Sequence, residues 1–109
     1  ALLVALEPAA SPILTSGHSG SHHVDGVGLG FIPEKYEAQL VDRPLAIKEE
    51  EARLICRELA QKEGLFCGTS SGMNVAGAIA LSQELGPEST VVAVACDTGL
   101  KYLQSGLFD

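Results

Sequence analysis

The sequence predicts an α/β domain built on a mostly parallel open sheet with flanking helices. Two short and almost continuously apolar runs, Leu2–Leu6 and Thr90–Cys96, are typical of strands buried on both faces. Between them lie two long segments with helical periodicity, Glu49–Glu63 and Gly72–Leu85. Strands that alternate with helices favour a parallel sheet, because each helix carries the chain back to the start of the next strand.

The first half of the chain predicts two strands joined by a long loop. Residues Thr15–Gly30, which follow the Leu2–Leu6 strand, are rich in Gly, Ser and His and predict a loop. A short helical turn is expected over Glu34–Glu37. The next strand, Leu40–Ile47, contains Pro44, which has no N–H to donate, and we therefore place this strand at an edge of the sheet.

The second half predicts two helices, a strand and a short terminal helix. The Glu49–Glu63 helix is expected to end at Gly64. Its apolar face consists of Ala52, Ile55, Cys56 and Leu59. The buried face expected for the Gly72–Leu85 helix consists of Val75, Ala78, Ile79 and Ser82. The Thr90–Cys96 strand follows, and Lys101–Ser105 predicts the terminal helix.

Composition excludes several classes of protein. With 109 residues the chain holds one domain at most. Its hydrophobic content of 46% is too high for a disordered chain. Its net charge of −7 argues against nucleic acid and anionic membrane surfaces as partners. No apolar run approaches the ~18 residues that a membrane span requires.

The cysteines and the start of the chain bear on its location and extent. Cys56, Cys67 and Cys96 are not closely spaced, which favours reduced, buried thiols in a cytoplasmic protein. The chain begins without a methionine and without a charged leader. We therefore expect it to be a piece of a longer protein.

The segment Gly68–Gly72, with the sequence G-T-S-S-G, is the first candidate for a binding site. It follows the apolar run Leu65–Cys67 and opens the second long helix. A helix N-terminus attracts an anion or a polar ring edge, because its first N–H groups are unpaired and carry partial positive charge. The alternative is simple helix capping by Ser or Thr, worth about 1 kcal/mol.

Three loops are expected to meet at one edge of the sheet. They follow the predicted strands or apolar runs: the Gly- and His-rich loop, the Gly68–Gly72 turn and the segment Cys96–Gly99. Ligands of open α/β sheets bind beyond the carboxyl ends of the strands. Convergence of these loops would therefore form a single site.

The run Gly26–Gly30, G-V-G-L-G, does not predict a dinucleotide site. A dinucleotide fingerprint leaves a strand and enters a helix, whereas this run leaves a polar loop and enters Phe31–Pro33. We interpret its glycines as positions where the backbone approaches a ligand or a lid closely.

The loop histidines and the serines do not form a metal or hydrolase motif. His18, His22 and His23 have no cysteine or carboxylate at ligand spacing except Asp25, so we predict no metal site. We interpret them as solvated or substrate-facing residues. The serines of G-T-S-S-G do not form a G-x-S-x-G elbow, which argues against a Ser-His-Asp hydrolase.

Four blocks of sequence, taken in order, carry a resemblance to a known family. They are Leu6-Glu7-Pro8 with Ser11, then G-V-G-L-G-F-I-P at Gly26–Pro33, then E-G-L-F-C-G-T-S-S-G at Glu63–Gly72, and D-T-G-L-K-Y-L at Asp97–Leu103 with Leu107-Phe108. Together they resemble the C-terminal third of the cysteine synthase family, which are fold-type II pyridoxal-phosphate enzymes and include cystathionine β-synthase. The resemblance implies that residues 1–109 belong to the large domain of a tryptophan synthase β-like fold.

The resemblance implies roles for three residues at the cofactor. Ser70 matches the serine that donates to the pyridine nitrogen of pyridoxal phosphate. Gly26 matches a loop glycine on the substrate side of the cofactor. Cys96 occupies a position beside the ring where many members have proline. A hydroxyl partner does not force the pyridine nitrogen to be protonated, which suits β-replacement better than transamination.

The resemblance also implies a substrate entrance and a reaction. The Gly17–Gly30 loop, with His22, His23 and Gly28, would help to shape the entrance. The intact enzyme would be a cysteine synthase of cysteine biosynthesis, a transferase or lyase that replaces the acetate of O-acetylserine with sulfide to give L-cysteine. A homodimer is expected. The alternatives are cystathionine β-synthase, which uses serine and homocysteine, and a non-catalytic standalone binding module.

The resemblance assigns no catalytic residue to this chain. The family's Schiff-base lysine belongs to an N-terminal segment that has no match here. None of the lysines present, Lys35, Lys48, Lys62 and Lys101, lies in a family-like motif. We therefore expect the isolated chain to be inactive.

Overall fold

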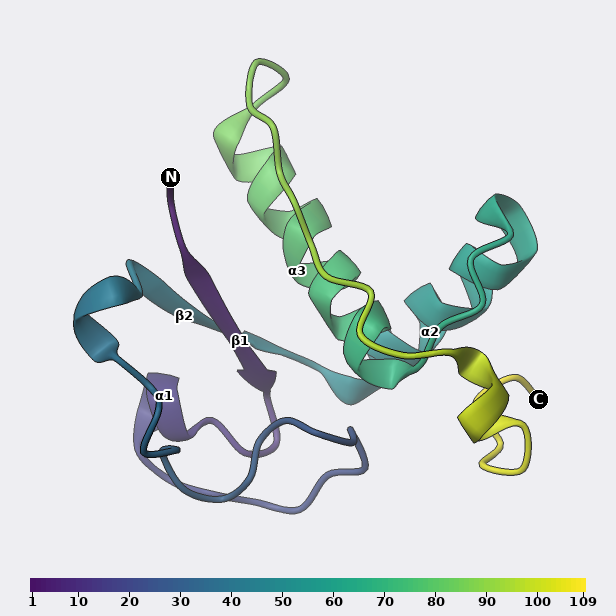
Figure 1. The fold of residues 1–109 in the computed structure, drawn as a ribbon, viewed down its shortest axis with the longest axis horizontal. Coiled ribbons are helices and arrows are strands. Elements are labelled where there is room, and N and C mark those ends of the chain that lie inside the picture. The colour runs from purple at the N-terminus through teal and green to yellow at the C-terminus, as the bar shows by residue number, and fades with distance from the viewer.

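A computed structural model describes residues 1–109, and Figure 1 shows its longest helices beside a small sheet. The elements are β1 (Val4–Pro8), α1 (Ile13–Ser16), the 3₁₀ turn η1 (Ala38–Leu40), β2 (Arg43–Ile47), α2 (Glu49–Glu58), the π-helical turn η2 (Leu59–Glu63), α3 (Thr69–Leu85) and the 3₁₀ turn η3 (Gly99–Tyr102). The predicted α/β class and the parallel pairing are confirmed. None of the helices has the length and apolar character needed to cross a membrane.

The sheet consists of β1 and β2, which pair in parallel with Leu6 opposite Leu45. β1 begins two residues later than predicted, and Leu2 and Leu3 are about half exposed. Each strand pairs on one side only. Pro44 therefore lies at a sheet edge, as predicted, where its missing N–H leaves no ladder bond unmade.

The predicted helix Glu49–Glu63 is confirmed as one continuous helical segment formed by α2 and η2. Ala52 and Cys56 on its apolar face are completely buried. Gly64 ends the segment with a left-handed backbone, φ 70°, which glycine adopts without steric cost. Sequence periodicity was sufficient here because the polar face of the helix is exposed to solvent.

Helix α3 differs from its prediction in both its start and its buried face. It begins at Thr69, three residues before the predicted Gly72. Its buried apolar positions are Met73, Ala76, Gly77 and Leu81, whereas the predicted Ile79 and Ser82 are exposed and Val75 and Ala78 are half-buried. The predicted face was therefore wrong.

Small residues decide which face of α3 is buried. A methyl group at Gly72 would collide with the carbonyl oxygen of Ala52 and the sulfur of Cys56, and one at Gly77 would lie 2.7 Å from Leu6 Cδ1. The backbone of α3 therefore lies directly against α2 and β1. A hydrophobicity pattern is dominated by large apolar side chains, and it therefore does not detect a contact surface formed by glycine.

The predicted strand Thr90–Cys96 is not a strand in this chain. It runs as an extended segment alongside α3 (Figure 1), where Asn74 Nδ2 donates to the Val94 carbonyl at 2.9 Å. Val92 and Val94 are 86% and 66% exposed, so the prediction that this segment is buried on both faces is wrong for this chain. The physical reason is that no strand within residues 1–109 pairs with it.

The remaining predictions for the loop and the carboxyl end hold in part. The four-residue helix α1, which the sequence did not indicate, overlaps the start of the predicted loop. The turn at Glu34–Lys35 is not helical, and the 3₁₀ turn η1 follows it instead. The expected helix Lys101–Ser105 is η3 followed by turns.

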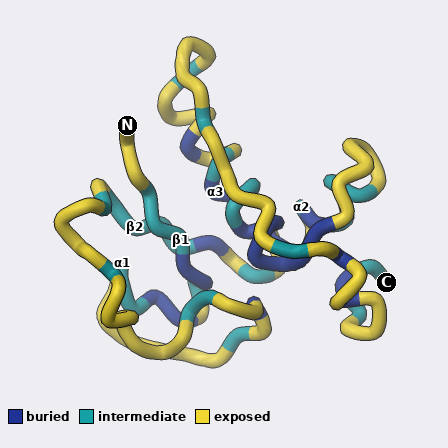
Figure 2. Tube along the Cα trace, in the orientation of Figure 1, coloured by how far each residue is buried: buried dark blue, intermediate teal, exposed yellow.

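Buried residues gather where α2 crosses the start of α3, whereas the carboxyl-terminal end of α3 and the chain that follows η2 are exposed (Figure 2). One cluster contains Val24, Ile47, Ala52, Met73 and Ala76, and a second contains Cys56, Tyr102 and Leu107. A mostly apolar cleft of about 460 Å³ lies between β1, α3 and residues 90–94. This cleft exposes apolar surface that a folded chain tends to cover by association.

We predict that the isolated chain associates through this cleft or remains partly molten. Sedimentation at micromolar concentration should give a mass above the 11.3 kDa of the monomer. Val92→Glu should shift the equilibrium toward the monomer, because it places a charge on the apolar surface. Gln61→Glu adds the same charge on η2 and is the control. A compact monomer with dispersed amide signals would contradict this prediction.

Candidate cofactor-binding site

The first turn of α3 is polar in sequence but buried in the fold. Thr69, Ser70 and Ser71 are 1%, 6% and 0% exposed. The N-cap residue is Gly68, whose backbone is extended and which has no side chain to accept a hydrogen bond. The serines are therefore not N-caps. The N–H groups of the first turn have no preceding helical carbonyl to donate to, and they point toward the space before the helix.

The two serines have different environments. Ser71 Oγ accepts a hydrogen bond from the backbone N–H of Cys96 at 2.8 Å, which ties the segment after residue 90 to α3. The hydroxyl of Ser70 has no hydrogen-bond partner within the chain. Ser71 is therefore occupied by the fold, and Ser70 is the hydroxyl available to a ligand.

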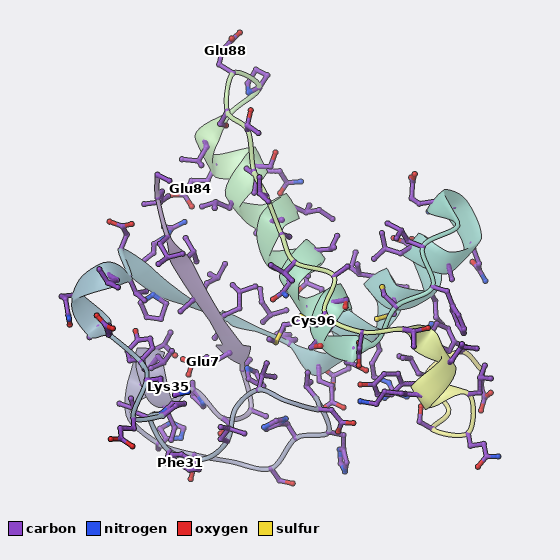
Figure 3. The ribbon with its side chains drawn as sticks, in the orientation of Figure 1. Glu7, Phe31, Lys35, Glu84, Glu88 and Cys96 are labelled. Atoms are coloured by element: carbon purple, nitrogen blue, oxygen red, sulfur yellow. The ribbon has the colours of Figure 1, made fainter.

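Cys96 lies beside this turn, as the sequence led us to expect. Figure 3 shows it at the N-terminal end of α3. Its backbone is held by Ser71, and Asn74 Nδ2 lies 3.4 Å from its sulfur. The Cys96 side chain is exposed, which corrects the expectation that all three thiols are buried.

The glycine loop is held by contacts within itself and with the end of β1. Gly26, Gly28 and Gly30 have φ values of 81°, 56° and 85°, a region that other residues rarely adopt. A methyl group at Gly28 would lie 2.9 Å from the Pro8 ring and would also collide with His22. The close approach seen at Gly28 is therefore between parts of this chain, and the approach of these glycines to a ligand or a lid stays a prediction.

The two predicted loop histidines lie in different settings. His22 Nδ1 accepts from the Val24 N–H at 3.1 Å, so Nε2 carries the proton and donates to the Gly28 carbonyl at 2.7 Å. Both ring nitrogens of His22 are thus used to organise the loop. The His23 side chain is 85% exposed, and its Nδ1 lies 3.9 Å from Glu49 Oε1. His23 is therefore exposed to solvent, whereas both nitrogens of the His22 ring are engaged.

The expected convergence of three loops is met directly by two of them. Gly68–Gly72 and the segment from Cys96 to Gly99 share the Ser71 hydrogen bond and a backbone bridge between Cys67 and Thr98. The glycine loop reaches α3 only through packing, since buried Val24 contacts the cluster that contains Met73. Residues 26–30 also line a separate pocket of about 210 Å³.

No group of three His, Cys, Asp or Glu side chains lies close enough together to hold a metal ion. The chemistry of the site therefore depends on hydroxyls, backbone N–H groups and thiols. Two of the thiols belong to the core: Cys56 Sγ donates to the Gly68 carbonyl at 3.0 Å, and Cys67 is 3% exposed.

Sequence reasoning assigned no role to two residues near the turn. Tyr102 Oη donates to Asp97 Oδ2 at 2.6 Å, directly beside Gly68. The spacing of five residues between them falls on no regular helix or strand period, so periodicity gave no signal. Both residues belong to the block D-T-G-L-K-Y-L, one of the blocks that carry the family resemblance, and this was the sequence signal that could have identified them.

The comparisons with known proteins identify the class of protein first. Residues 2–97 match the family described as "Pyridoxal-phosphate dependent enzyme", and the chain belongs to this family. The resemblance stated from the motifs is thereby confirmed, and the family description agrees with the expected cofactor.

Individual relatives then narrow the comparison. The chain is 38% identical over 106 residues to a cysteine synthase of Staphylococcus aureus, covering 97% of this chain and 34% of that protein. A hydrogen sulfide-producing enzyme of Fusobacterium nucleatum superposes with a TM-score of 0.92 at 34% identity, covering 100% of this chain and 33% of that one. A cysteine synthase of Entamoeba histolytica gives a TM-score of 0.89 at 32% identity over 98% of this chain and 32% of that one.

The chain thus spans about a third of the length of the curated relatives it matches, 34% for the Staphylococcus aureus enzyme. The sequence predicted that the chain is about one third of the intact enzyme, and this agrees with the 34% of the relative that it covers. Its placement at the carboxyl end of such an enzyme stays a prediction, as do the roles of individual residues.

The environments of the thiols predict selective alkylation. Burial raises the pKa of Cys56 to about 11 and also raises the pKa of Cys67, so both thiols stay protonated at pH 8. Because the thiolate is the reactive form, iodoacetamide should label exposed Cys96 at least tenfold faster than the buried pair, on the order set by their thiolate fractions and access. Peptide mass spectrometry measures the rates, with the denatured chain as control. Equal labelling of all three in folded protein would contradict this assignment.

Proposed function

We propose that this chain is part of a pyridoxal-phosphate-dependent cysteine synthase that converts O-acetylserine and sulfide to L-cysteine. Membership of the family and similarity to the Staphylococcus aureus and Entamoeba histolytica cysteine synthases support the proposal. The observation that carries it within this chain is the unpartnered Ser70 hydroxyl, 6% exposed, at the N-terminus of α3.

The residues present fit pyridoxal phosphate. The cofactor's pyridine nitrogen needs a hydrogen-bond partner, and of the two serines in the first turn Ser70 is the one whose hydroxyl the fold leaves free. When bound, pyridoxal phosphate supplies an electron sink for reactions at the α- and β-carbons of amino acids. A neutral hydroxyl holds the ring without requiring a proton on its nitrogen, and so favours replacement at the β-carbon.

Other residues would shape the walls of the site. Ser71 and Asn74 hold Cys96 in place beside the first turn, where its side chain would border the ring. Gly26 and Gly28 have no side chains, and they would leave room for the substrate where the loop borders the cofactor. His23 would contact an incoming substrate. His22 would act indirectly, by holding the Gly28 carbonyl.

We assign no catalytic residue to this chain. Lys62 pairs with Glu58 at 3.0 Å and Lys101 lies 3.6 Å from Asp97, so both serve surface ion pairs. The lysine that bonds the cofactor would come from the part of the enzyme that lies outside this third. The intact enzyme would be a cytoplasmic homodimer.

Cystathionine β-synthase activity is the second candidate. An O-acetylserine-dependent cystathionine β-synthase of Helicobacter pylori is 36% identical and superposes with a TM-score of 0.89 over 98% of this chain and 35% of that one. Assays of the intact enzyme with O-acetylserine and either sulfide or homocysteine distinguish the two. Faster turnover with sulfide supports our proposal. A standalone module that binds without catalysis would show neither activity.

Ser70→Ala in the intact enzyme tests the proposal directly. The variant should keep the fold, because Ser70 makes no hydrogen bond within the chain, and should weaken cofactor binding by about tenfold, the effect of losing one buried hydrogen bond of ~1–3 kcal/mol. Ser70→Asp should reduce β-replacement further, because a carboxylate favours a protonated ring nitrogen.

Ser82→Ala, at an exposed position on the same helix, is the matched control. Cofactor affinity is measured by fluorescence titration, and turnover by cysteine formation. If the Ser70 variants and the control all matched the parent enzyme, Ser70 would have only a structural role.

A further inference from the structure

The segment from Cys96 to Phe108 packs against the residues that lead into α3. The N–H of Gly99 donates to the Phe66 carbonyl at 3.0 Å, and an isolated antiparallel bridge joins Cys67 to Thr98. The Phe66 and Phe108 rings pack with their centroids 4.8 Å apart. The backbone just before Gly68 is thereby clamped to a segment about thirty positions later in the sequence.

Asp97 and Tyr102 form the polar centre of this clamp. Tyr102 is 7% exposed and donates its phenolic proton to Asp97 Oδ2 at 2.6 Å. The second carboxylate oxygen, Oδ1, is buried without a hydrogen-bond partner. Burial and the hydrogen bond to Asp97 raise the pKa of Tyr102, so the phenol keeps its proton across the physiological range.

Both side chains occupy the space directly against Gly68. A methyl group at Gly68 would collide with Asp97 Oδ1 and with the Tyr102 ring. On another side, the Cys56 thiol donates to the Gly68 carbonyl at 3.0 Å. The N-cap of α3 is thus held by side chains from two parts of the chain, and Ser70 lies two residues further along the same turn.

The pair is a costly way to stabilise a fold. A buried carboxylate oxygen without a partner loses its hydration and regains nothing from hydrogen bonding. Two electrostatic contacts offset this cost. Lys101 Nζ lies 3.6 Å from Asp97 Oδ2, and the carboxylate lies at the positive end of the α3 dipole. The hydrogen bond from Tyr102 fixes the position of the carboxylate against Gly68, and so fixes the start of the helix.

We propose that Asp97 and Tyr102 are a positioning pair that fixes the first turn of α3, and so aims the Ser70 hydroxyl at the cofactor ring. This inference rests on the proposed function, since it needs Ser70 to hold the cofactor. In this role Tyr102 acts through its contacts with Asp97 and Gly68.

Tyr102→Phe in the intact holoenzyme removes only the phenolic oxygen and leaves the ring against Gly68. Cofactor affinity should fall on the order of threefold to tenfold, the effect of one lost hydrogen bond, and the absorption maximum and fluorescence of bound cofactor should shift. Tyr36→Phe is the control, because the Tyr36 hydroxyl makes no hydrogen bond within the chain. A loss of thermal stability with unchanged cofactor affinity and spectrum would overturn the inference.

Asp97 provides the second arm of the test. Asp97→Asn keeps an oxygen that can accept from Tyr102 and should retain most of the cofactor affinity, whereas Asp97→Ala should lose at least as much as Tyr102→Phe. Equal affinities for the Asn and Ala variants would count against a hydrogen bond as the positioning element.

A double-mutant cycle separates this inference from the proposed function. If Tyr102 acts through Ser70, Tyr102→Phe should have little further effect on cofactor affinity in a Ser70→Ala background. Fully additive effects would overturn the positioning role while leaving Ser70 as the cofactor partner. No effect of Ser70→Ala alone would instead show that the proposed function fails at its own residue.

Discussion

The close contact between α2 and the first turns of α3 is the constraint on which the rest of this structure depends. Gly72 lies against the Ala52 carbonyl and the Cys56 sulfur with no room for a side chain. Once the two backbones meet there, Met73 and Ala76 point into the main core and the turn before α3 is buried. The position of Ser70 follows from a glycine contact, with large apolar side chains filling the space around it.

The buried polar turn is where the fold and the proposed chemistry meet. Thr69, Ser70 and Ser71 lose their contact with water when the chain folds, yet only Ser71 is matched by a hydrogen bond of its own, from Cys96. The Ser70 hydroxyl has no hydrogen-bond partner within the chain, and it is therefore open to a ligand. A ligand that accepts from or donates to that hydroxyl gains a hydrogen bond, which is why we place the proposed cofactor site at this turn.

Helices and motifs were the most predictable part of this protein. The extent of the helical segment formed by α2 and η2 could be predicted because its polar face is exposed and Gly64 marks its end. Ser70 and Cys96 were placed at one site by motif, and the structure brings them together through Ser71 and Asn74. The buried face of α3 and the state of Thr90–Cys96 were not predictable, because both depend on which neighbours the chain has in space.

The sequence by itself determined the α/β class, the parallel pairing and the family, and it pointed to the turn that we propose for the cofactor, because these depend on local patterns and on blocks of contiguous residues. Only the tertiary structure decided that Ser71 is occupied while Ser70 is free, that His22 is engaged while His23 is exposed, and that Asp97 and Tyr102 meet at Gly68. These outcomes depend on hydrogen bonds and close contacts between segments distant in sequence, and no local pattern encodes which of two neighbouring side chains will find a partner.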